Sequence, residues 1–213
     1  MTVWPYFIET DAVNLAVPLA EIKTWLKVSG TTLDAEITSL IQGATKTAEH
    51  LMKRDLINKT YRTFRDCFSD AQLCQANYAA LIPRYSEVSL NVIELRKSRL
   101  QSVTSIECLK SDVWTLVDSA VYYNTVESAY SSILLVDGQS WPPDLDNRAQ
   151  AVRIDFVAGY GPDSDDIPGD LKTAIKMHVA NAFANRGDCA SGAFLPKSAR
   201  ATYSLNRIME LGA

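Results

Sequence analysis

The sequence of 213 residues has few of the side chains that build catalytic and metal sites. It contains two histidines and four cysteines, and the cysteines, at positions 67, 74, 108 and 189, form no C-x-x-C pair. It has no G-x-S-x-G nucleophile motif, no phosphate-binding loop motif and no H-E-x-x-H zinc motif. We therefore predict no catalytic residue, no cofactor and no metal site, and we expect reduced cysteines in an intracellular protein.

Long apolar runs and an excess of basic charge are also missing. No stretch approaches the ~20 apolar residues of a membrane helix. Residues 1–10 lack the basic and then apolar order of a secretory signal, so none is expected. The 21 basic residues are outnumbered by 25 acidic ones, which gives a net charge of −4. This balance argues against a protein that coats nucleic acid, because such proteins carry a basic surface.

The remaining composition, 47% hydrophobic and 22% charged, is that of a globular protein. Helical spacing of apolar residues occurs at both ends of the chain. A first helix is expected from Pro18 to a left-handed stop at Gly30. A longer helix follows, with Thr31-x-x-Asp34 as its cap and Lys53 and Arg54 at its end. Two more helices are expected at residues 167–187 and 196–209.

Strand patterns fill the middle of the chain, and their short connections favour antiparallel pairing. They lie at residues 61–68, 88–95, 103–109, 113–117, 121–126, 133–136 and 151–158. The predicted class is α+β, with a helical core formed by residues 1–57 and 161–213. A β-rich insertion occupies residues 58–160.

Candidate titratable groups favour structural roles. His50 is expected at the surface near the end of the long helix, and His178 lies on an apolar helix face, which favours a core or interface position. An acidic loop could offer oxygen ligands to Ca²⁺ but lacks the spacing of an EF-hand. Its members are Asp163, Asp165, Asp166 and Asp170. We expect Asp165 or Asp166 to cap the helix that Pro168 opens.

Several further segments carry information through their order. Upstream, Leu19–Leu26 precedes a long helix that runs to Arg54-x-Leu56-Ile57. The strand LQSVTSI at 100–106 and the turn Trp141-Pro142 come next. VRIDFVAGYG at 152–161, an acidic loop, Ile167-Pro168 and a helix ending at Asn185-Arg186 complete the series. In this order the segments resemble the head–tail connector (adaptor or head completion) proteins of tailed bacteriophages.

The resemblance covers residues 15–210, with two departures. Residues 95–99 lack the family's Leu-Pro-x-x-Pro, and residues 189–195 match no family pattern. The resemblance implies a structural protein that catalyses nothing and forms a ring, expected to be a dodecamer, under the portal. Its implied partners are further copies of itself, the portal protein and a tail or stopper protein, while DNA passes through the ring without specific binding. The implied location is the virion, and the bacterial host cytoplasm before assembly. No membrane contact is expected.

The expected contact residues lie at the two ends of the chain. The last helix, Ser198–Leu211 by resemblance, is implied to reach the portal. The residues that we expect to contact it are Arg200, Tyr203, Arg207 and Ile208. The arginines fit a solvated helix face equally well. Trp4, Tyr6 and Phe7 are expected to contact a neighbouring subunit or to pack on the protein's own core.

Two other functions stay open at this point. One is a tail-side completion or terminator protein, and the less favoured one is a small soluble ligand-binding or hydrolytic domain.

Overall fold

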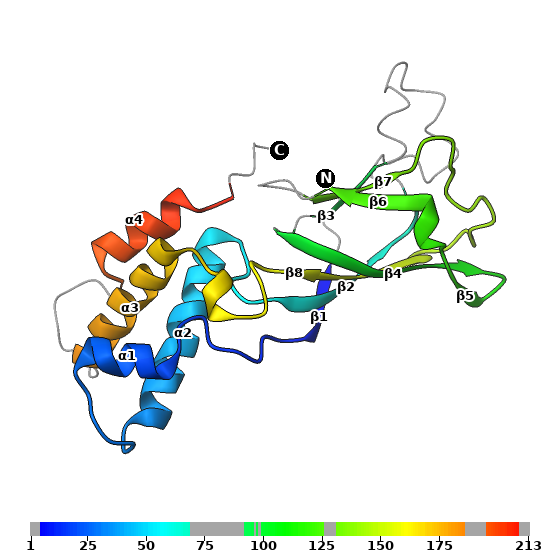
Figure 1. The fold of residues 1–213 in the computed structure, drawn as a ribbon. Helices are drawn as coiled ribbons and strands as arrows, with labels where there is room; N and C mark the ends of the chain where they lie inside the picture. Colours follow the sequence, from blue (N-terminus) through cyan, green and yellow to red (C-terminus); the bar gives the residue numbers. More distant parts are fainter. Residues whose placement is uncertain are drawn as a thin grey trace. The chain divides into compact units, whose positions relative to one another are not determined.

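The chain folds as two compact units, seen in a computed structural model that describes residues 5–68, 92–95, 97, 99–125, 131–185 and 195–208. The helical unit comprises Ala12–Asn58 and Gly159–Gly212, and the sheet unit comprises Met1–Asp11 and Lys59–Ala158. The α+β class is confirmed, with helices and antiparallel sheets in separate units (Figure 1). Within the described residues, no helix has the length and apolar character needed to cross a membrane.

The helical unit contains four α-helices and one short 3-10 helix among its described residues. The bounds are α1 Leu19–Leu26, α2 Asp34–Met52, η4 Ser164–Asp166, α3 Gly169–Ala184 and α4 Lys197–Leu205. All four expected α-helices are present. Both C-terminal helices are shorter than expected, because α3 ends at Ala184 and α4 at Leu205, and residues 206–208 are not helical. The expected end points, residues 187, 209 and 211, themselves lie outside the described residues.

The helix ends differ from the expected caps. Helix α1 stops at Leu26 because Lys27 adopts the left-handed conformation at φ 56°, three residues before Gly30. Helix α2 has Leu33 at its cap position, without a side-chain cap, so the expected Thr31-x-x-Asp34 cap is wrong. The Asp34 carboxylate instead pairs with the Lys23 ammonium at 2.6 Å. This ion pair ties α2 to α1, which a cap would not do.

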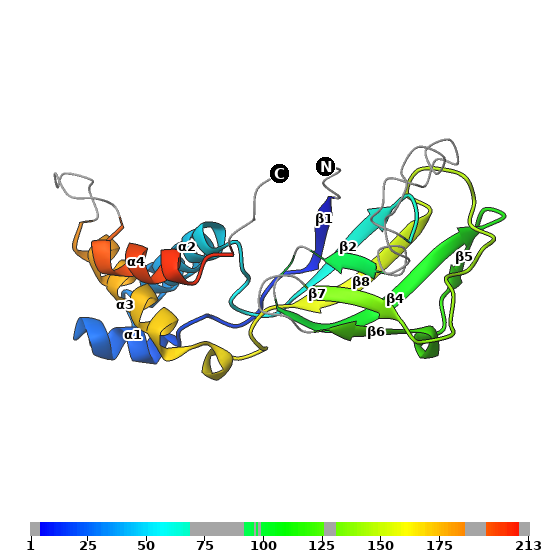
Figure 2. The ribbon, with the colours of Figure 1, turned by 90° about the horizontal axis from the view of Figure 1, so that it is seen from above.

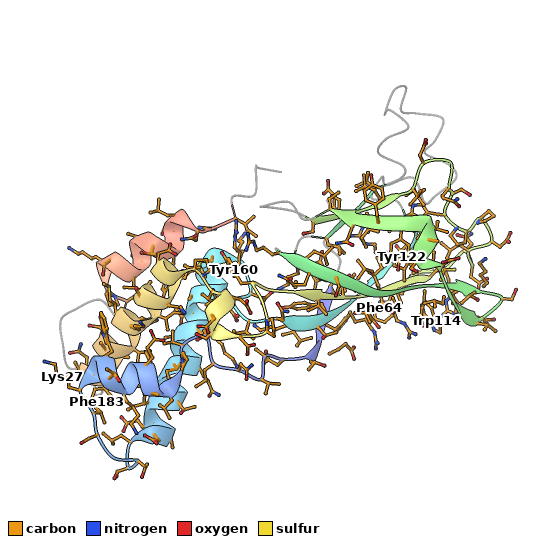
Figure 3. All side chains as sticks on the ribbon, in the orientation of Figure 1. Lys27, Phe64, Trp114, Tyr122, Tyr160 and Phe183 are labelled. Carbon is orange, nitrogen blue, oxygen red and sulfur yellow. The ribbon has the colours of Figure 1, made fainter. Side chains whose placement is uncertain are left out.

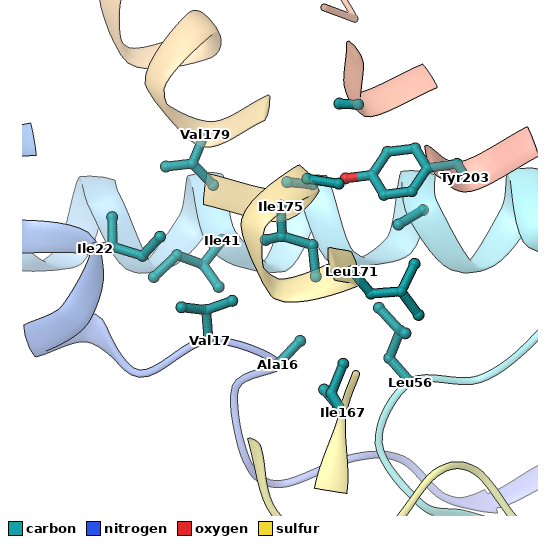
Figure 4. Close-up of a cluster of buried hydrophobic side chains, with 14 of the residues drawn as sticks. Ala16, Val17, Ile22, Ile41, Leu56, Ile167, Leu171, Ile175, Val179 and Tyr203 are labelled. Carbon is teal, nitrogen blue, oxygen red and sulfur yellow. The ribbon is translucent and has the colours of Figure 1, made fainter. Parts of the chain in front are cut away.

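The core of the helical unit forms where one apolar stripe from each helix meets the others. Ile22, Ile41, Ile175, Val179 and Tyr203 are all fully buried there (Figure 4). Within α2, α3 and α4 the buried residues recur mostly at spacings of three and four, as Ile175 and Val179 do, so each of these helices turns one face to the same interior. Full burial of each such side chain contributes roughly 1.5–3 kcal/mol.

The sheet unit contains two antiparallel sheets (Figure 2). The five-stranded sheet has the order β1 (Tyr6–Thr10), β2 (Lys59–Arg65), β8 (Val152–Ala158), β4 (Leu100–Lys110), β5 (Val113–Leu116). The three-stranded sheet has the order β3 (Val92–Leu95), β7 (Ser131–Leu135), β6 (Tyr122–Thr125), and η3 (Ser119–Val121) precedes β6. Each expected strand is present, but residues 66–68, 117, 121, 136 and 151 lie outside the strands. Residues 88–91 and 126 lie outside the described residues.

Strand β1 belongs to a different unit than the sequence analysis expected. Residues 1–57 were expected to belong with the helices, but Tyr6–Thr10 pairs with β2 in the sheet unit. The segment has too few residues for a recognisable alternation, so its partner strand decides its structure.

The sandwich core is the cluster of buried side chains between the two sheets. Every second residue of β2 and of β8 points into it. Tyr61 stacks on Phe156 with ring centroids 5.6 Å apart. Arg65 follows the same alternation and is fully buried, and its guanidinium donates to the Glu94 carbonyl of the opposite sheet. The period of two in β2 places Arg65 inward, a position that the sequence analysis overlooked.

The cysteines depart from expectation. Cys108 is a free, buried thiol, but Cys67 is disulfide-bonded, so the expectation of reduced cysteines is wrong for Cys67. Burial raises the pKa of the Cys108 thiol. Cys74 and Cys189 lie outside the described residues.

Candidate interaction surfaces

The C-terminal segment exposes basic side chains on α4 and just after it. Arg200 and Arg207 are exposed, and the side chain of Leu205 between them is 87% exposed. No acidic residue occurs between positions 195 and 208, although the whole chain carries a net charge of −4. The described part of the C-terminal segment therefore offers a basic surface with one apolar side chain at its centre.

Tyr203 and Ile208 do not belong to this face. Both are buried in the helical unit, and the Ile208 amide donates to the Met52 carbonyl at 3.0 Å. Their expected place on an exposed portal-binding stripe is wrong, because Ala199 and Tyr203, four residues apart, form the inward side of α4.

The aromatic residues of β1 divide between core and surface. Tyr6 packs edge-on against Phe156, with ring centroids 6.0 Å apart, at the margin of the sandwich core. Phe7 and Ile8 are about half exposed, at 48% and 52%. Trp4 lies outside the described residues. Of the two expected subunit-contact residues that the structure describes, Phe7 is exposed and Tyr6 is half-buried.

The outer face of the five-stranded sheet carries paired charges. The Arg62 guanidinium donates to both carboxylate oxygens of Asp155, at 2.8 and 2.9 Å, and lies 3.1 Å from Glu9. The hydrogen bond to Asp155 is the main reason why the pKa of Arg62 is raised. Arg153 pairs with Glu107 and covers the Trp114 ring at 4.7 Å. These charges neutralise one another across neighbouring strands.

Strand β5 forms an exposed apolar edge of the same sheet. Val113 and Leu116 are 63% and 64% exposed, and Trp114 contacts Phe64 on the outer face (Figure 3). None of the four residues of β5 is charged. Edge strands of monomeric proteins are normally protected by charged side chains, proline or bulges. The sequence predicts the strand, but not that no other described strand pairs with its outer edge.

The hairpin turn before β5 is held by a carboxylate. Ser111 and Asp112 both have positive φ, the geometry of a two-residue hairpin turn that usually contains glycine. The Asp146 carboxylate accepts hydrogen bonds from the amides of Asp112 and Ser111 at 2.9 and 2.8 Å. These bonds lower the pKa of Asp146. The clamp holds the exposed strand in a defined shape.

The histidines and the acidic loop have structural surroundings. His50 is exposed on α2, as expected. In the loop, the Asp166 carboxylate accepts from the Asp163 amide at 3.0 Å within η4, whereas α3 has no side-chain cap. The expected capping of α3 by Asp165 or Asp166 is therefore wrong. Among the described residues, no group of three or more potential ligands forms a metal site.

His178 is buried in the helical unit, with its ring centroid 6.4 Å from that of Tyr203, and burial lowers its pKa. The unfolded chain therefore binds a proton at a higher pH than the folded chain does. We expect the contribution of His178 to the free energy of unfolding to be constant well above pH 6.5 and to decrease as the pH falls below that value, with a slope of at most about 1.4 kcal/mol per pH unit.

Urea unfolding at pH 7.5 and pH 5.0 measures this dependence. In His178→Gln the decrease between the two pH values should be smaller than in the original chain, since the titrating group is gone. An equal decrease in both proteins would contradict the role of His178.

Comparison with known proteins identifies the fold. No family model matches the chain, and no curated protein matches its sequence. A chain in the neck of an empty gene transfer agent (GTA) particle, computed with C6 symmetry, superposes with a TM-score of 0.73 at 22% identity, covering 97% of both chains. A chain in the virion of the native GTA particle gives 0.70 at 21% identity, covering 97% of this chain and 96% of that one.

A third chain, in the neck of the native GTA particle computed with C12 symmetry, gives a TM-score of 0.69 at 21% identity and covers 97% of both chains. At these identities the likeness establishes the fold over nearly the full length of the chain.

Proposed function

We propose that this protein is a head–tail connector (adaptor) of a tailed phage or phage-like particle. It forms a ring under the portal, extends the DNA channel and provides the attachment site for the tail or a stopper protein. The observation that carries the proposal is the shared fold with chains of GTA necks and virions over 97% of the sequence. The ordered connector-like segments between residues 15 and 210 support it independently.

A ring explains the symmetry of the similar structures. The two necks were computed with C6 and C12 symmetry, and twelve copies satisfy both. A ring closes through head-to-tail contacts, so each subunit needs two different contact surfaces. The acidic net charge suits a channel from which DNA must be released, because affinity for duplex DNA comes mainly from cation–phosphate contacts.

The portal contact that we propose consists of exposed side chains of α4 and of the residues just after it. Arg200 and Arg207 supply charge, and Leu205 supplies an exposed apolar side chain. Because Tyr203 and Ile208 are buried, they act by holding α4 in place and not by touching the portal. Removal of the last helix would therefore open the core of the helical unit, and surface substitutions are the cleaner test.

Charge reversal at these two arginines is expected to weaken portal binding. The double variant Arg200→Glu and Arg207→Glu should weaken co-sedimentation with portal rings from the same particle by about tenfold or more, equivalent to about 1.4 kcal/mol. The matched control reverses Lys27 and Lys46, which are exposed elsewhere on the helical unit, and should bind like the original chain.

The outcomes separate the role from the site. If binding survives reversal of both arginines, the connector role is still supported, but the proposed contact at Arg200 and Arg207 is contradicted. If the original chain does not bind portal rings at all, the connector proposal fails, and a tail-side completion or terminator protein becomes the better assignment.

A further inference from the structure

We propose that the two edge strands of the five-stranded sheet form the contact between neighbouring subunits, with β5 of one copy docked on β1 of the next. The inference rests on the proposed ring, and it names the surfaces through which copies of this chain meet. Its starting observation is that both edges expose apolar side chains and that, among the described residues, no strand pairs with the outer side of either edge.

The first argument is the composition of the two edges. β5 exposes Val113 and Leu116 on a strand without charge. β1 exposes Phe7 and Ile8, and it also carries Glu9, which pairs with Arg62, and a register irregularity between Ile8 and Thr10. An edge strand without charge, as β5 is, pairs readily with another strand through its backbone amides and carbonyls. The partner that fits this edge is a strand that also exposes apolar side chains, and β1 of a second copy supplies one.

The second argument is the position of the edges. They lie at opposite sides of one sheet, so a single unit carries two different surfaces, as a head-to-tail contact requires. Four antiparallel pairings separate β1 from β5, so the two strands run in the same direction. Copies related by rotation about a ring axis would therefore pair β5 with β1 in parallel. A two-fold dimer would instead join identical edges in antiparallel fashion.

The third argument is that β5 and the adjoining sheet face are already ordered and charge-paired before a neighbouring subunit covers them. The Asp146 clamp fixes the turn before β5, so little conformational entropy is lost when the strand docks. On the adjoining face, Arg62 is paired with Asp155, and Arg153 with Glu107. A neighbouring subunit that covers this face leaves no unpaired charge from these four groups.

Single substitutions at each edge test the contact. Leu116→Glu on β5 and Ile8→Glu on β1 should each reduce multimers of the full chain by about tenfold or more, on portal rings and in concentrated solution. Val13→Glu is the matched control, because Val13 is apolar and 91% exposed but lies in the helical unit. Sedimentation velocity of the free chain, and the number of copies bound per portal ring, provide the two measurements.

A mixture of the two edge variants separates a head-to-tail contact from a two-fold one. The Leu116→Glu chain keeps a sound β1, and the Ile8→Glu chain keeps a sound β5, so the mixture should form pairs but no larger rings. If Ile8→Glu assembles normally while Leu116→Glu does not, the contact is a two-fold one and the proposal is overturned. If both behave like Val13→Glu, the edges are not the contact.

Cross-linking tests the proposed neighbours directly. The double variant Thr10→Cys and Thr115→Cys, treated with a short bismaleimide, should give a ladder of covalent multimers, whereas each single variant and the original chain should not. If the chain binds portal rings but gives no such ladder, the connector role is supported and the proposed edge contact is contradicted. If portal binding itself fails, the ladder in the free chain still decides the edge contact, because its presence supports the contact and its absence overturns it.

Discussion

Alanine at position 159 is expected to destabilise the helical unit by about 2–6 kcal/mol. Gly159 has φ 150°, a conformation that costs other residues about 1–3 kcal/mol. A Cβ atom there would also lie 2.7 Å from the backbone N and Cα of Asn58, and relief of such an overlap costs about 1–3 kcal/mol more. Neither atom can move aside as the end of a side chain could.

The close approach at Gly159 has a structural purpose. The Asn58 amide donates to the Gly161 carbonyl at 2.9 Å, and the Tyr160 amide reaches the Leu56 carbonyl at 3.4 Å. These bonds join the end of the first half of the helical unit to the start of its second half. Glycine at position 159 allows the two segments to lie together.

Chemical denaturation of the full-length chain measures the effect, and Gly43→Ala is the matched control. Gly43 lies in the interior of α2 with no atom near the position of an added Cβ, so alanine should stabilise the protein there by about 0.5–1 kcal/mol. Equal stability of Gly159→Ala and the original chain would show that the contact with Asn58 is absent from the folded protein.

Tyr203→Ala is the second substitution with a large expected effect. Tyr203 is fully buried among residues from the other helices, and it is the largest side chain that α4 gives to the core (Figure 4). Loss of a buried aromatic ring costs about 3–5 kcal/mol, because contacts disappear and a cavity remains. Portal binding should fall together with stability, since α4 loses its anchor.

Tyr203→Phe is the control that separates the ring from its hydroxyl. The buried hydroxyl has no hydrogen-bond partner among the described residues, and burial raises the pKa of Tyr203. Phenylalanine should therefore leave the protein equally stable or up to about 1 kcal/mol more stable. A loss of more than about 1 kcal/mol in Tyr203→Phe would show that the hydroxyl is paired in the folded protein.

The two measurements also distinguish packing from recognition. Tyr203→Ala should change both the unfolding midpoint and portal binding. Reversal of Arg200 and Arg207 should change binding alone, because both side chains are exposed. A binding loss without a stability loss is therefore the result specific to the proposed contact.

Local patterns were sufficient for the class and the order of the elements. The stripes that contain Ile41 and Ile175 recur at helical spacing, and the alternation along residues 152–158 places Ile154 and Phe156 on one side. Such periodicities follow from the helix and strand geometry of neighbouring residues, so they can be recognised from the sequence without knowledge of the fold. His178 was assigned to a core or interface position for the same reason, and it is buried.

Pairing across long separations could not be read in the same way. Tyr6–Thr10 became a strand because β2, about fifty residues later, offered it a partner. The Asp146 carboxylate, which clamps the turn at Ser111, lies in a segment with no regular pattern of its own. Likewise, the Thr31-x-x-Asp34 motif does not cap α2, because the Asp34 carboxylate pairs with Lys23 of α1.

The surfaces show the same division most clearly. The sequence by itself determined that α4 is amphipathic, but only tertiary packing decided that Tyr203 points inward and Arg200 outward. It also predicted the strand β5, but only the sheet order of the described strands placed β5 at an edge. Periodicity shows which residues share a face. Whether that face is buried depends on the elements that pack against it, and these are brought together only in the folded chain.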